Sequence, residues 1–439
     1  MSELLELAQI AVEGAIAAGA DQADAGASRG EDIGVEIERN RIKSSDASWT
    51  GGISVRAFSR GGVGWANTGK LDADAAREAG ARAAEMARVA EPDPDFVSLP
   101  EPAAWSEVEG EHDQRVADLT VDQVVEWCLG HVDEALQVAA DAIVSAGGGA
   151  GRHEGAIANS LGVAHPWQRS GVGLSAFVII KRGDDVGSYY EFDQARVLAD
   201  LEPEGIGTKA AEEALKFLGA RNVPTTTLPV VFGPLASISL IQSLCYHANA
   251  EDIQRRRSYL VGRKGQRIAS ELLTISDEPL IPRGLGSGRC DGEGFPHKPI
   301  TIVENGVLLT YLHNSYTANK AKEPNTGHGT RGGISPTNVI PQLGRATAAE
   351  IIADTHQGIY LNSGGVSPNS VTGEISATVD FGFKIENGRL AYPVKSTLLG
   401  IHMLKLLQHI DAISSDYREE PGMIMPTIRA QGVQVAGGA

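Results

Sequence analysis

His247 and Glu251 lie four positions apart in a segment whose apolar spacing predicts one helix from Pro234 to about Ile253. Residues four apart share a helix face, so the pair could supply half of a metal site or a general acid and base. The plainer interpretation is a polar face near a helix end. We favour it because short patterns of this kind arise often by chance.

Metal chemistry requires a denser set of ligands than this sequence offers. A catalytic zinc on a helix needs two histidines about one turn apart and a glutamate that activates water. His153-Glu154 is the only His-Glu pair, and no histidine follows it within the next turn. His402 and His409 are seven positions apart, which is two helical turns and too far to share one ion. We therefore predict no catalytic residue and no metal ligand in this chain.

A glycine-rich segment from Gly64 to Lys70 has the spacing of a phosphate-binding loop. Leu71 stands where such a loop needs a hydroxyl for magnesium. Asp72 then places a negative charge at the start of the next helix, where a phosphate would bind. The segment predicts an ordinary strand, turn and helix.

The overall charge argues against a nucleic-acid partner. The chain has 38 basic and 56 acidic residues and a formal net charge of -18, which repels phosphate backbones. Its three cysteines are widely spaced, which is typical of a reducing compartment. The N-terminus is acidic where a signal peptide would be basic, and no segment is apolar enough to span a membrane. We expect a soluble, cytoplasmic protein without membrane contact.

Local signals place several elements along the chain. Ser2 is a candidate N-cap for a first helix, Asp72 for a helix that reaches about residue 90, and Thr120 with Gln123 forms a candidate capping box. Short strands are predicted around 22–29, 32–38, 51–59 and 61–67, and a longer one at 171–180. Near the C-terminus, residues 398–410 predict an amphipathic helix.

These elements indicate an α+β protein, because helices gather around sheets without the regular alternation of a doubly wound fold. We predict an N-terminal region of the α/β sandwich type, with mixed sheets and helices. A larger, mostly antiparallel, β-rich C-terminal domain follows it. Segments rich in proline suggest boundaries that divide the chain into 1–100, 101–222 and 223–439.

A series of short blocks in the last two hundred residues resembles the TldD/PmbA (TldD/TldE) peptidase family. Each block is weak alone, but together they occur in the family's order. They are QRRRSYL at 254–260, DGEGFP at 291–296, IVENG at 302–306, YLHNSYTA at 311–318, TGE at 372–374 and PTIR at 426–429. The N-terminal pattern of helix and strands agrees, so the resemblance covers nearly the whole chain.

The resemblance also implies which branch of the family this is. The family's metal-bearing subunit, TldD, carries His-Glu-x-x-x-His on its central helix and a cysteine ligand near the C-terminus. The equivalent helix here, from Gln242 to His247, has no His-Glu pair, and the stretch from Glu420 to Pro426 has no cysteine. The chain therefore resembles the metal-free TldE/PmbA subunit, and zinc is expected in a TldD-like partner.

The implied partners are a TldD-like metallopeptidase subunit and an extended peptide, with a homodimer possible when the chain is alone. Exposed sheet edges can pair with extended peptides with little sequence dependence. Asp291 and Glu293 could line such a groove. They could equally form a turn whose carboxylates accept backbone N–H bonds.

Two other functions remain open from the sequence. The chain could be a regulatory protein of the DNA-gyrase-modulator type without a proteolytic role. It could also be an independent hydrolase that uses His247 and Glu251.

Overall fold

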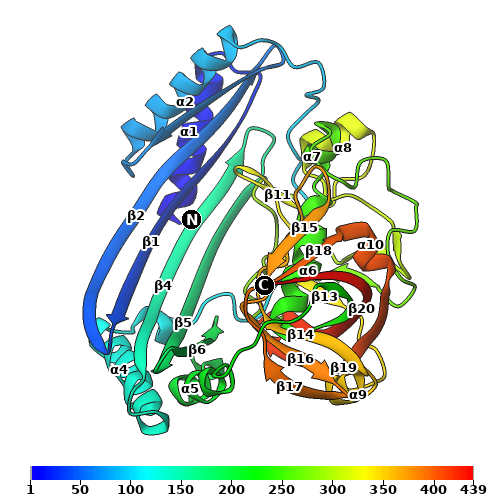
Figure 1. Ribbon diagram of the computed structural model, residues 1–439. Helices are drawn as coiled ribbons and strands as arrows, with labels where there is room; N and C mark the ends of the chain where they lie inside the picture. Colours follow the sequence, from blue (N-terminus) through cyan, green and yellow to red (C-terminus); the bar gives the residue numbers. More distant parts are fainter. Residues whose placement is uncertain (1, 439) are drawn as a thin grey trace.

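The computed structural model describes residues 2–438 and has two large parts (Figure 1). Residues 22–195 form one long, curved antiparallel sheet with helices, and residues 226–437 form a β-rich half that contains several sheets. The two parts face each other along the length of the curved sheet. This arrangement confirms the predicted α+β class.

The N-terminal sheet has six strands in the order β3-β2-β1-β4-β5-β6. Its central pair, β1 and β4, joins segments more than a hundred residues apart. The strands are β1 (Gln22–Glu38), β2 (Arg41–Ser59), β3 (Gly62–Thr68), β4 (Ile143–Asn159), β5 (Ala164–Arg182) and β6 (Asp185–Ala195). Strands from both sides of residue 100 share this sheet, and a subdomain boundary at that residue stays a prediction.

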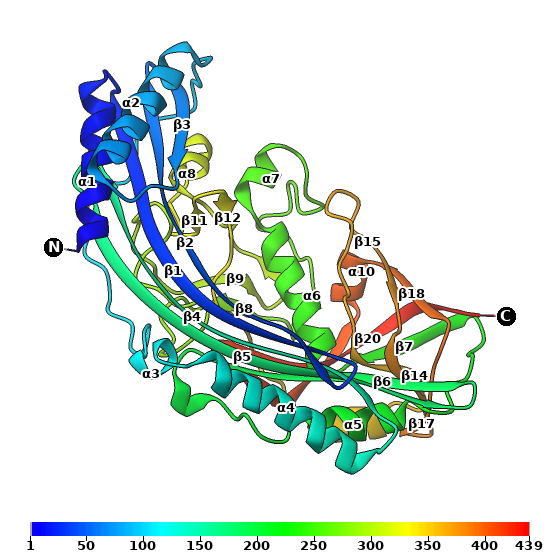
Figure 2. The same cartoon turned by 90° about the vertical axis from the view of Figure 1, so that its left-hand side faces the viewer.

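The two faces of this sheet differ because side chains alternate along a strand. In β1, Ala23, Ala25 and Ala27 are buried against the first two helices. The Asp24 side chain lies on the opposite face, toward the C-terminal half, and Gly26 lines a cavity on that face. Figure 2 shows the helices on the outer side of the curve and the C-terminal half on its inner side. The inner face of β1 therefore places Asp24 opposite the C-terminal half.

The outer helices begin at the predicted caps. Ser2 and Asp72 each accept a hydrogen bond from a first-turn N–H, and Thr120 with Gln123 forms the capping box. The helices of this half are α1 (Glu3–Ala17), α2 (Ala73–Val89), α3 (Gln114–Ala117), α4 (Val121–Val138) and α5 (Ile206–Lys216), with a 3-10 turn at Leu198–Asp200. Helices α1 and α2 pack closely at Gly80, where an added Cβ would lie 2.1 Å from the Ala11 carbonyl oxygen.

The prediction of separate short strands at 22–29 and 32–38 was wrong. Both belong to the 17-residue strand β1, and β2 begins ten residues before the predicted start at 51. The first part of β2 is solvent-exposed, so its side chains lack the apolar alternation that identifies a strand in a sequence. Backbone pairing with β1 holds this part of β2 in place.

The C-terminal half is built on a sheet of eight strands in which β7 and β14 are parallel and the other pairs are antiparallel. Seven strands follow the order β15-β18-β20-β7-β14-β16-β17, and β19 pairs with β20. These strands are β7 (Thr226–Phe232), β14 (Gln357–Ser363), β15 (Glu374–Thr378), β16 (Phe381–Glu386), β17 (Arg389–Pro393), β18 (Thr397–His402), β19 (Ile410–Glu420) and β20 (Met423–Gly437).

Smaller elements complete this half. A second sheet contains β8 (Ile275–Asp277), β9 (Ile300–Glu304), β10 (Val307–Leu308) and β13 (Val339–Pro341). A short hairpin pairs β11 (Gly329–Thr330) with β12 (Gly333–Ile334). The helices are α6 (Pro234–His247), α7 (Ala250–Gln254), α8 (Ser315–Ala321), α9 (Ala348–Ala353) and α10 (Met403–Gln408).

Two predicted helices of this half were wrong in extent. The helix expected from Pro234 to about Ile253 ends at His247, because Ala248 and Ala250 form backbone hydrogen bonds with Leu312 instead. Within the helix predicted at 398–410, the first residues belong to strand β18, which pairs with β15 and β20. Only the six residues of α10 are helical there. In both places, contacts between distant segments override the local pattern.

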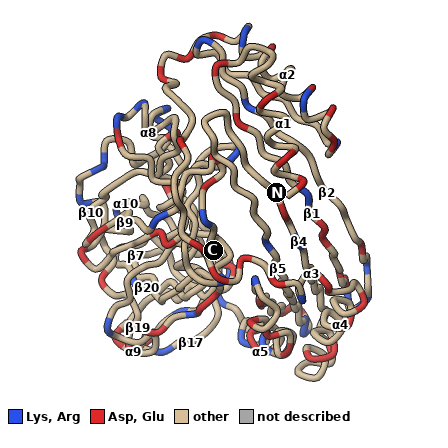
Figure 3. Tube along the Cα trace, turned by 180° about the vertical axis from the view of Figure 1, so that it is seen from behind, with Lys and Arg blue, Asp and Glu red and all other residues tan. Residues whose placement is uncertain are grey.

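The distribution of charge and the apolar length of the helices are relevant to contact with nucleic acids and membranes. Figure 3 shows lysine and arginine interspersed with aspartate and glutamate over both halves of the molecule. No helix within residues 2–438 is long and apolar enough to cross a membrane.

Candidate functional site

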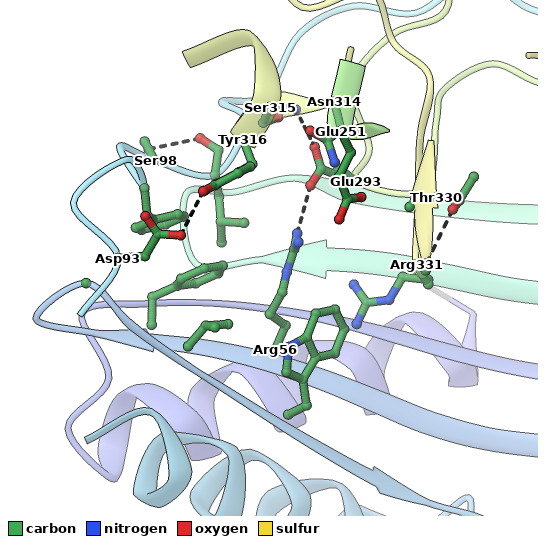
Figure 4. A pocket seen from close by; sticks show the side chains of 18 of the residues that line it. Arg56, Asp93, Ser98, Glu251, Glu293, Asn314, Ser315, Tyr316, Thr330 and Arg331 are labelled. Carbon is green, nitrogen blue, oxygen red and sulfur yellow. Dashed lines mark hydrogen bonds and ion pairs between the residues drawn. The ribbon is translucent and has the colours of Figure 1, made fainter. Parts of the chain in front are cut away.

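A cavity of about 310 Å³ lies between the outer end of the N-terminal sheet and helices α7 and α8. We call it the aromatic cavity, because four of its lining side chains are aromatic rings. Figure 4 shows its charged residues converging from both halves of the chain. Its lining includes Arg56, Phe58, Trp65, Phe96, Glu251, Arg255, Glu293, Tyr316, Thr330 and Arg331.

A buried ion network forms the floor of this cavity. The Arg56 guanidinium lies 2.5 Å from Asp24 Oδ2 and 2.9 Å from Glu293 Oε1. Arg331 contacts the other oxygen of Asp24 at 2.7 Å. Glu293 also accepts a hydrogen bond from the Ser315 backbone N–H at 2.8 Å. The network therefore joins β1 and β2 to the loop and hairpin of the C-terminal half.

Burial and ion pairing act against each other on the pKa values of this network. Burial alone raises the pKa of Asp24, but the charges of Arg56 and Arg331 outweigh it and hold that pKa below its usual value. For Arg56, burial alone would lower the pKa. The negative charges of Asp24 and Glu293 outweigh burial and raise that pKa well above its usual value. Asp24 and Arg56 therefore stay charged at neutral pH.

A second cavity of about 380 Å³ lies on the other side of the β11–β12 hairpin, and we call it the histidine crevice. It shares Thr330 and Arg331 with the aromatic cavity. The sheet contributes its inner face, and the C-terminal half contributes the loops around residues 286–297 and 328–337. Its polar lining includes Ser28, His165, Arg169, Cys290, Asp291, His297, His328 and Arg331.

Asp291 ties the loop of the histidine crevice to the hairpin. Its Oδ1 accepts the backbone N–H groups of Glu293 and Phe295, and its Oδ2 accepts that of Gly329, each at 2.9 Å. Burial, followed by the nearby charge of Glu293, raises the pKa of Asp291 to about 7 despite these hydrogen bonds. Asp291 thus organises the backbone and lines the crevice at the same time.

The raised pKa of Asp291 predicts a specific pH dependence of stability. The folded state binds this proton more tightly than the unfolded chain, whose pKa is near 3.8. The stabilising contribution is therefore complete below pH 3.8 and is lost as the pH rises through about 7. Asp291→Asn should remove this slope, which amounts to at most about 1.4 kcal/mol per pH unit. Denaturant unfolding at several pH values measures it.

The control is Asp74→Asn, since the Asp74 side chain is almost fully exposed. This variant should keep the slope of the unaltered protein. If Asp291→Asn also keeps it, the carboxyl group is already ionised well below pH 7 and its burial has little effect.

The structure does not bring His247 and Glu251 together as a pair. His247 ends α6, and its Nδ1 lies 2.6 Å from the Ser243 carbonyl oxygen, while Glu251 belongs to α7 and pairs with Arg255 at 2.7 Å. Glu251 lines the aromatic cavity with Glu293, and Asp291 lines the histidine crevice. His247 lines neither. The helix ends between the two residues, so His247 and Glu251 do not share the single helix face that the sequence pattern predicted.

Helix α6 carries residues at the spacing of the His-Glu-x-x-x-His pattern. Gln242 and Ser243 take the first two positions, and His247 takes the last, so one of the two histidines is kept. The Gln242 amide contacts Met423, and burial raises the pKa of the Cys245 thiol well above its usual value. Residues 2–438 contain no group of three or more His, Cys, Asp or Glu side chains placed to hold a metal ion. The side chains of α6 therefore do not fit a catalytic zinc site.

Ser28 also lines the histidine crevice, in a Gly26-Ala-Ser-Arg-Gly30 sequence that has the spacing of a serine-hydrolase elbow. An elbow needs its serine on a sharp turn between a strand and a helix. Ser28 instead lies within β1, paired with Gly52 and Gly155 on the neighbouring strands. The spacing therefore has no elbow geometry here.

The comparisons with known proteins agree with this architecture. Models of the PmbA/TldA metallopeptidase domains match domain 1 at residues 23–87, the central domain at 115–218 and the C-terminal domain at 225–437. The chain therefore belongs to the PmbA/TldD family of metallopeptidases.

Similar relatives within the family carry the names PmbA and TldE. A metalloprotease PmbA homolog from Haemophilus influenzae is 27% identical, covering 99% of this chain and 96% of that protein. Metalloprotease PmbA from Escherichia coli is 24% identical, covering 95% and 92%. The crystal structure of TldE from Thermococcus kodakarensis has a TM-score of 0.88 at 25% identity, covering 99% and 100%. A Bacteroides thetaiotaomicron structure described as a modulator of DNA gyrase has a TM-score of 0.90 at 25% identity, covering both chains fully.

Proposed function

We propose that this chain is the metal-free subunit of a two-subunit metallopeptidase that degrades or processes unfolded peptides or peptide precursors. A TldD-like partner would carry the zinc and the chemistry. This chain would complete the enclosure and hold the substrate.

The central helix carries this proposal. Gln242 and Ser243 stand where the metal-bearing subunit has histidine and glutamate, and neither can replace them as a zinc ligand and a general base. The remaining histidine, His247, directs Nδ1 to the backbone of its own helix. The helix of the fold is thus kept, while its side chains lack the metal-binding set.

An open strand edge supports contact with an extended peptide. Strand β3 pairs with β2 only from Ile53 onward, whereas β1 pairs with β2 from Arg41. Residues 41–52 therefore have backbone groups on one side that β3 does not cover. Such an edge can bind another chain by backbone hydrogen bonds, with little dependence on its sequence.

The test is the zinc content and peptidase activity of this chain, alone and co-expressed with a TldD-like protein. We expect far less than one zinc per chain in the protein alone, and peptide cleavage only by the pair. His247→Ala in this chain should leave the activity of the pair nearly unchanged, whereas the same change in the partner's central helix should abolish it. Stoichiometric zinc and cleavage by the lone chain would refute the proposal.

The alternative is a regulatory role without proteolysis, as suggested by the description of two similar structures as modulators of DNA gyrase. Affinity purification of the full chain from cells distinguishes the regulatory role from the peptidase-subunit role. Recovery of gyrase without a TldD-like protein would favour the regulatory role, and recovery of the TldD-like protein would favour the peptidase subunit.

A further inference from the structure

The histidine crevice contains polar atoms that the described protein leaves without a hydrogen-bonding partner. Three are ring nitrogens of histidines that are at least nine-tenths buried, with exposed fractions of 3% for His165, 8% for His297 and 1% for His328. The His328 nitrogen, Nε2, lies 3.5 Å from a carboxylate oxygen of Asp277, without forming a hydrogen bond to it. Two are the Nε atoms of arginines at the same cavity, Arg169 and Arg331. A buried polar group without a partner costs about 1–3 kcal/mol. All five atoms are out of reach of solvent, and all belong to side chains that line one cavity, which makes this cavity the candidate site for a polar ligand.

Arg169 is the cation that this ligand would meet. Its guanidinium lies over the Trp167 ring at 5.6 Å, and no carboxylate among residues 2–438 pairs with it. Gly288 lets the loop approach closely, because an added Cβ there would lie 2.6 Å from the guanidinium. By contrast, Arg331 already pairs with Asp24. The crevice therefore offers one uncommitted positive charge.

A second guanidinium behind the crevice strengthens this positive field. Arg196 is buried and donates to the carbonyl oxygens of Leu285 and Ser287. Burial, with the charge of Arg169 added to it, lowers the pKa of Arg196 to about 10, so the group stays protonated at neutral pH. Arg196 does not line the crevice, but its charge acts on that of Arg169, and within the described part of the chain neither arginine forms an ion pair with a carboxylate.

The buried histidines can adapt to an anion without carrying charge. Burial, with nearby positive charges, lowers the pKa values of His165 and His297 to about 4. Both rings are therefore neutral at neutral pH, and each has one N–H to donate. The tautomer that carries its proton on the nitrogen facing the ligand can donate to it.

We propose that the histidine crevice binds a carboxylate group of a peptide, held by Arg169 and by N–H groups of the buried histidines. The planar guanidinium matches a carboxylate with two parallel hydrogen bonds. A doubly charged phosphate fits less well, because Asp291 lines the same cavity and would repel a second negative charge. The peptide as carrier of this carboxylate rests on the proposed function, whereas binding of the anion itself does not.

The position of the crevice favours the C-terminal carboxylate over an acidic side chain. Its volume of about 380 Å³ is at the lower end of ordinary ligand sites, which span roughly 300–1,000 Å³. The hairpin residues Thr330 and Arg331 separate it from the aromatic cavity. A peptide end would fill the crevice while the preceding residues lie toward the aromatic rings.

The experiment is isothermal titration calorimetry of the full chain with tetra-alanine as the free acid and as the C-terminal amide. The amide should bind about 10- to 100-fold more weakly, as expected for the loss of charge-assisted hydrogen bonds. Arg169→Gln should weaken binding of the free acid by a similar factor and leave the amide unchanged. Arg221→Gln is the matched control, since Arg221 also lies over an aromatic ring, Tyr392, but lines neither cavity.

Further arms distinguish the sources of the anion. The C-terminal amide of Ala-Ala-Glu-Ala tests a side-chain carboxylate, and tight binding of it would replace the C-terminal assignment. Competition by inorganic phosphate stronger than that by acetate would overturn the choice of carboxylate. Equal affinity for acid and amide, or no binding of either, would overturn the proposal.

The proposed function can fail separately from this inference, because the titration uses the lone chain and needs no peptidase activity. Carboxylate selectivity in a chain that never activates a TldD-like partner would refute only the subunit role. An active pair whose subunit shows no such selectivity would refute only the crevice assignment. Circular dichroism and the melting temperature of each variant show that it is folded.

Discussion

Arg56→Met should lower the free energy of unfolding by about 3–5 kcal/mol, as for other buried ion pairs that lose one partner. The substitution keeps much of the apolar stem but removes the guanidinium from Asp24 and Glu293. Arg331 still pairs with Asp24, whereas Glu293 keeps only the backbone N–H of Ser315. A nearly buried carboxylate is then left without a positive partner. Chemical denaturation measures the loss.

The pH dependence separates this electrostatic cause from a packing defect. In the unaltered protein the lowered pKa of Asp24 gives stability that is present above pH 3.8 and is lost as the pH falls through the folded-state pKa. Without Arg56 the largest charge that lowers the pKa of Asp24 is gone, so this pH-dependent part of the stability is smaller in the variant. The variant should therefore approach the unaltered protein at acidic pH and differ most at alkaline pH.

A matched exposed pair provides the control for this prediction. Arg77→Met removes an ion pair with Asp74 in which both side chains are more than half exposed. Its effect should be about 0.5 kcal/mol or less. An Arg56→Met loss equally small, or one that does not change with pH, would show that the network is hydrated and contributes little.

The N-terminal ends of the helices could be predicted because their signals are local. Ser2, Asp72 and Thr120 each accept a hydrogen bond from the first turn of the helix that follows, so a few adjacent residues contain the whole interaction. The strand at 171–180 was also predicted correctly, within the longer β5. Where the structure depends on distant partners, as at α6 and β18, the local pattern was misleading.

The charged network could not be predicted for the same reason. Arg56 is 32 positions from Asp24 and 237 from Glu293, and Arg331 is 307 from Asp24. The alternation of Ala23, Asp24 and Ala25 shows that Asp24 faces away from the alanines, but it does not show what lies opposite. Glu293, one of the candidate groove residues, lines one cavity together with Glu251. Their proposed contact with a peptide stays a prediction.

The histidines of the crevice show more clearly why a site formed by distant residues could not be predicted from the sequence. His165 belongs to β5, His297 to a loop and His328 precedes the hairpin, so no motif spacing relates them. Their shared property is an unpartnered ring nitrogen at one cavity, which is a feature of the folded molecule alone. In contrast, the missing His-Glu pair on α6 is fully local, and the sequence alone revealed it.

Phe217→Ala should also lower the free energy of unfolding by about 3–5 kcal/mol, the usual cost of truncating a buried phenylalanine. The ring follows α5 and is stacked on Tyr189 of β6 at 5.9 Å. It also contacts Phe381 and Phe383 of β16 at 5.6 and 4.8 Å. The cluster therefore joins the N-terminal sheet to the C-terminal half. Trp49→Ala, at a side chain that is 73% exposed, is the control and should change stability by less than about 0.5 kcal/mol.

This second variant also tests whether the two halves must be held together for binding. Both cavities are lined from both halves, and Phe217 lines neither. If the aromatic cluster fixes the spacing of the halves, Phe217→Ala should weaken binding of the free-acid peptide and of its amide by the same factor. The preference for the acid should persist, because Arg169 and the histidines are unchanged. Unaltered affinity in a destabilised but folded variant would instead show that the charged network alone sets the spacing at the cavities.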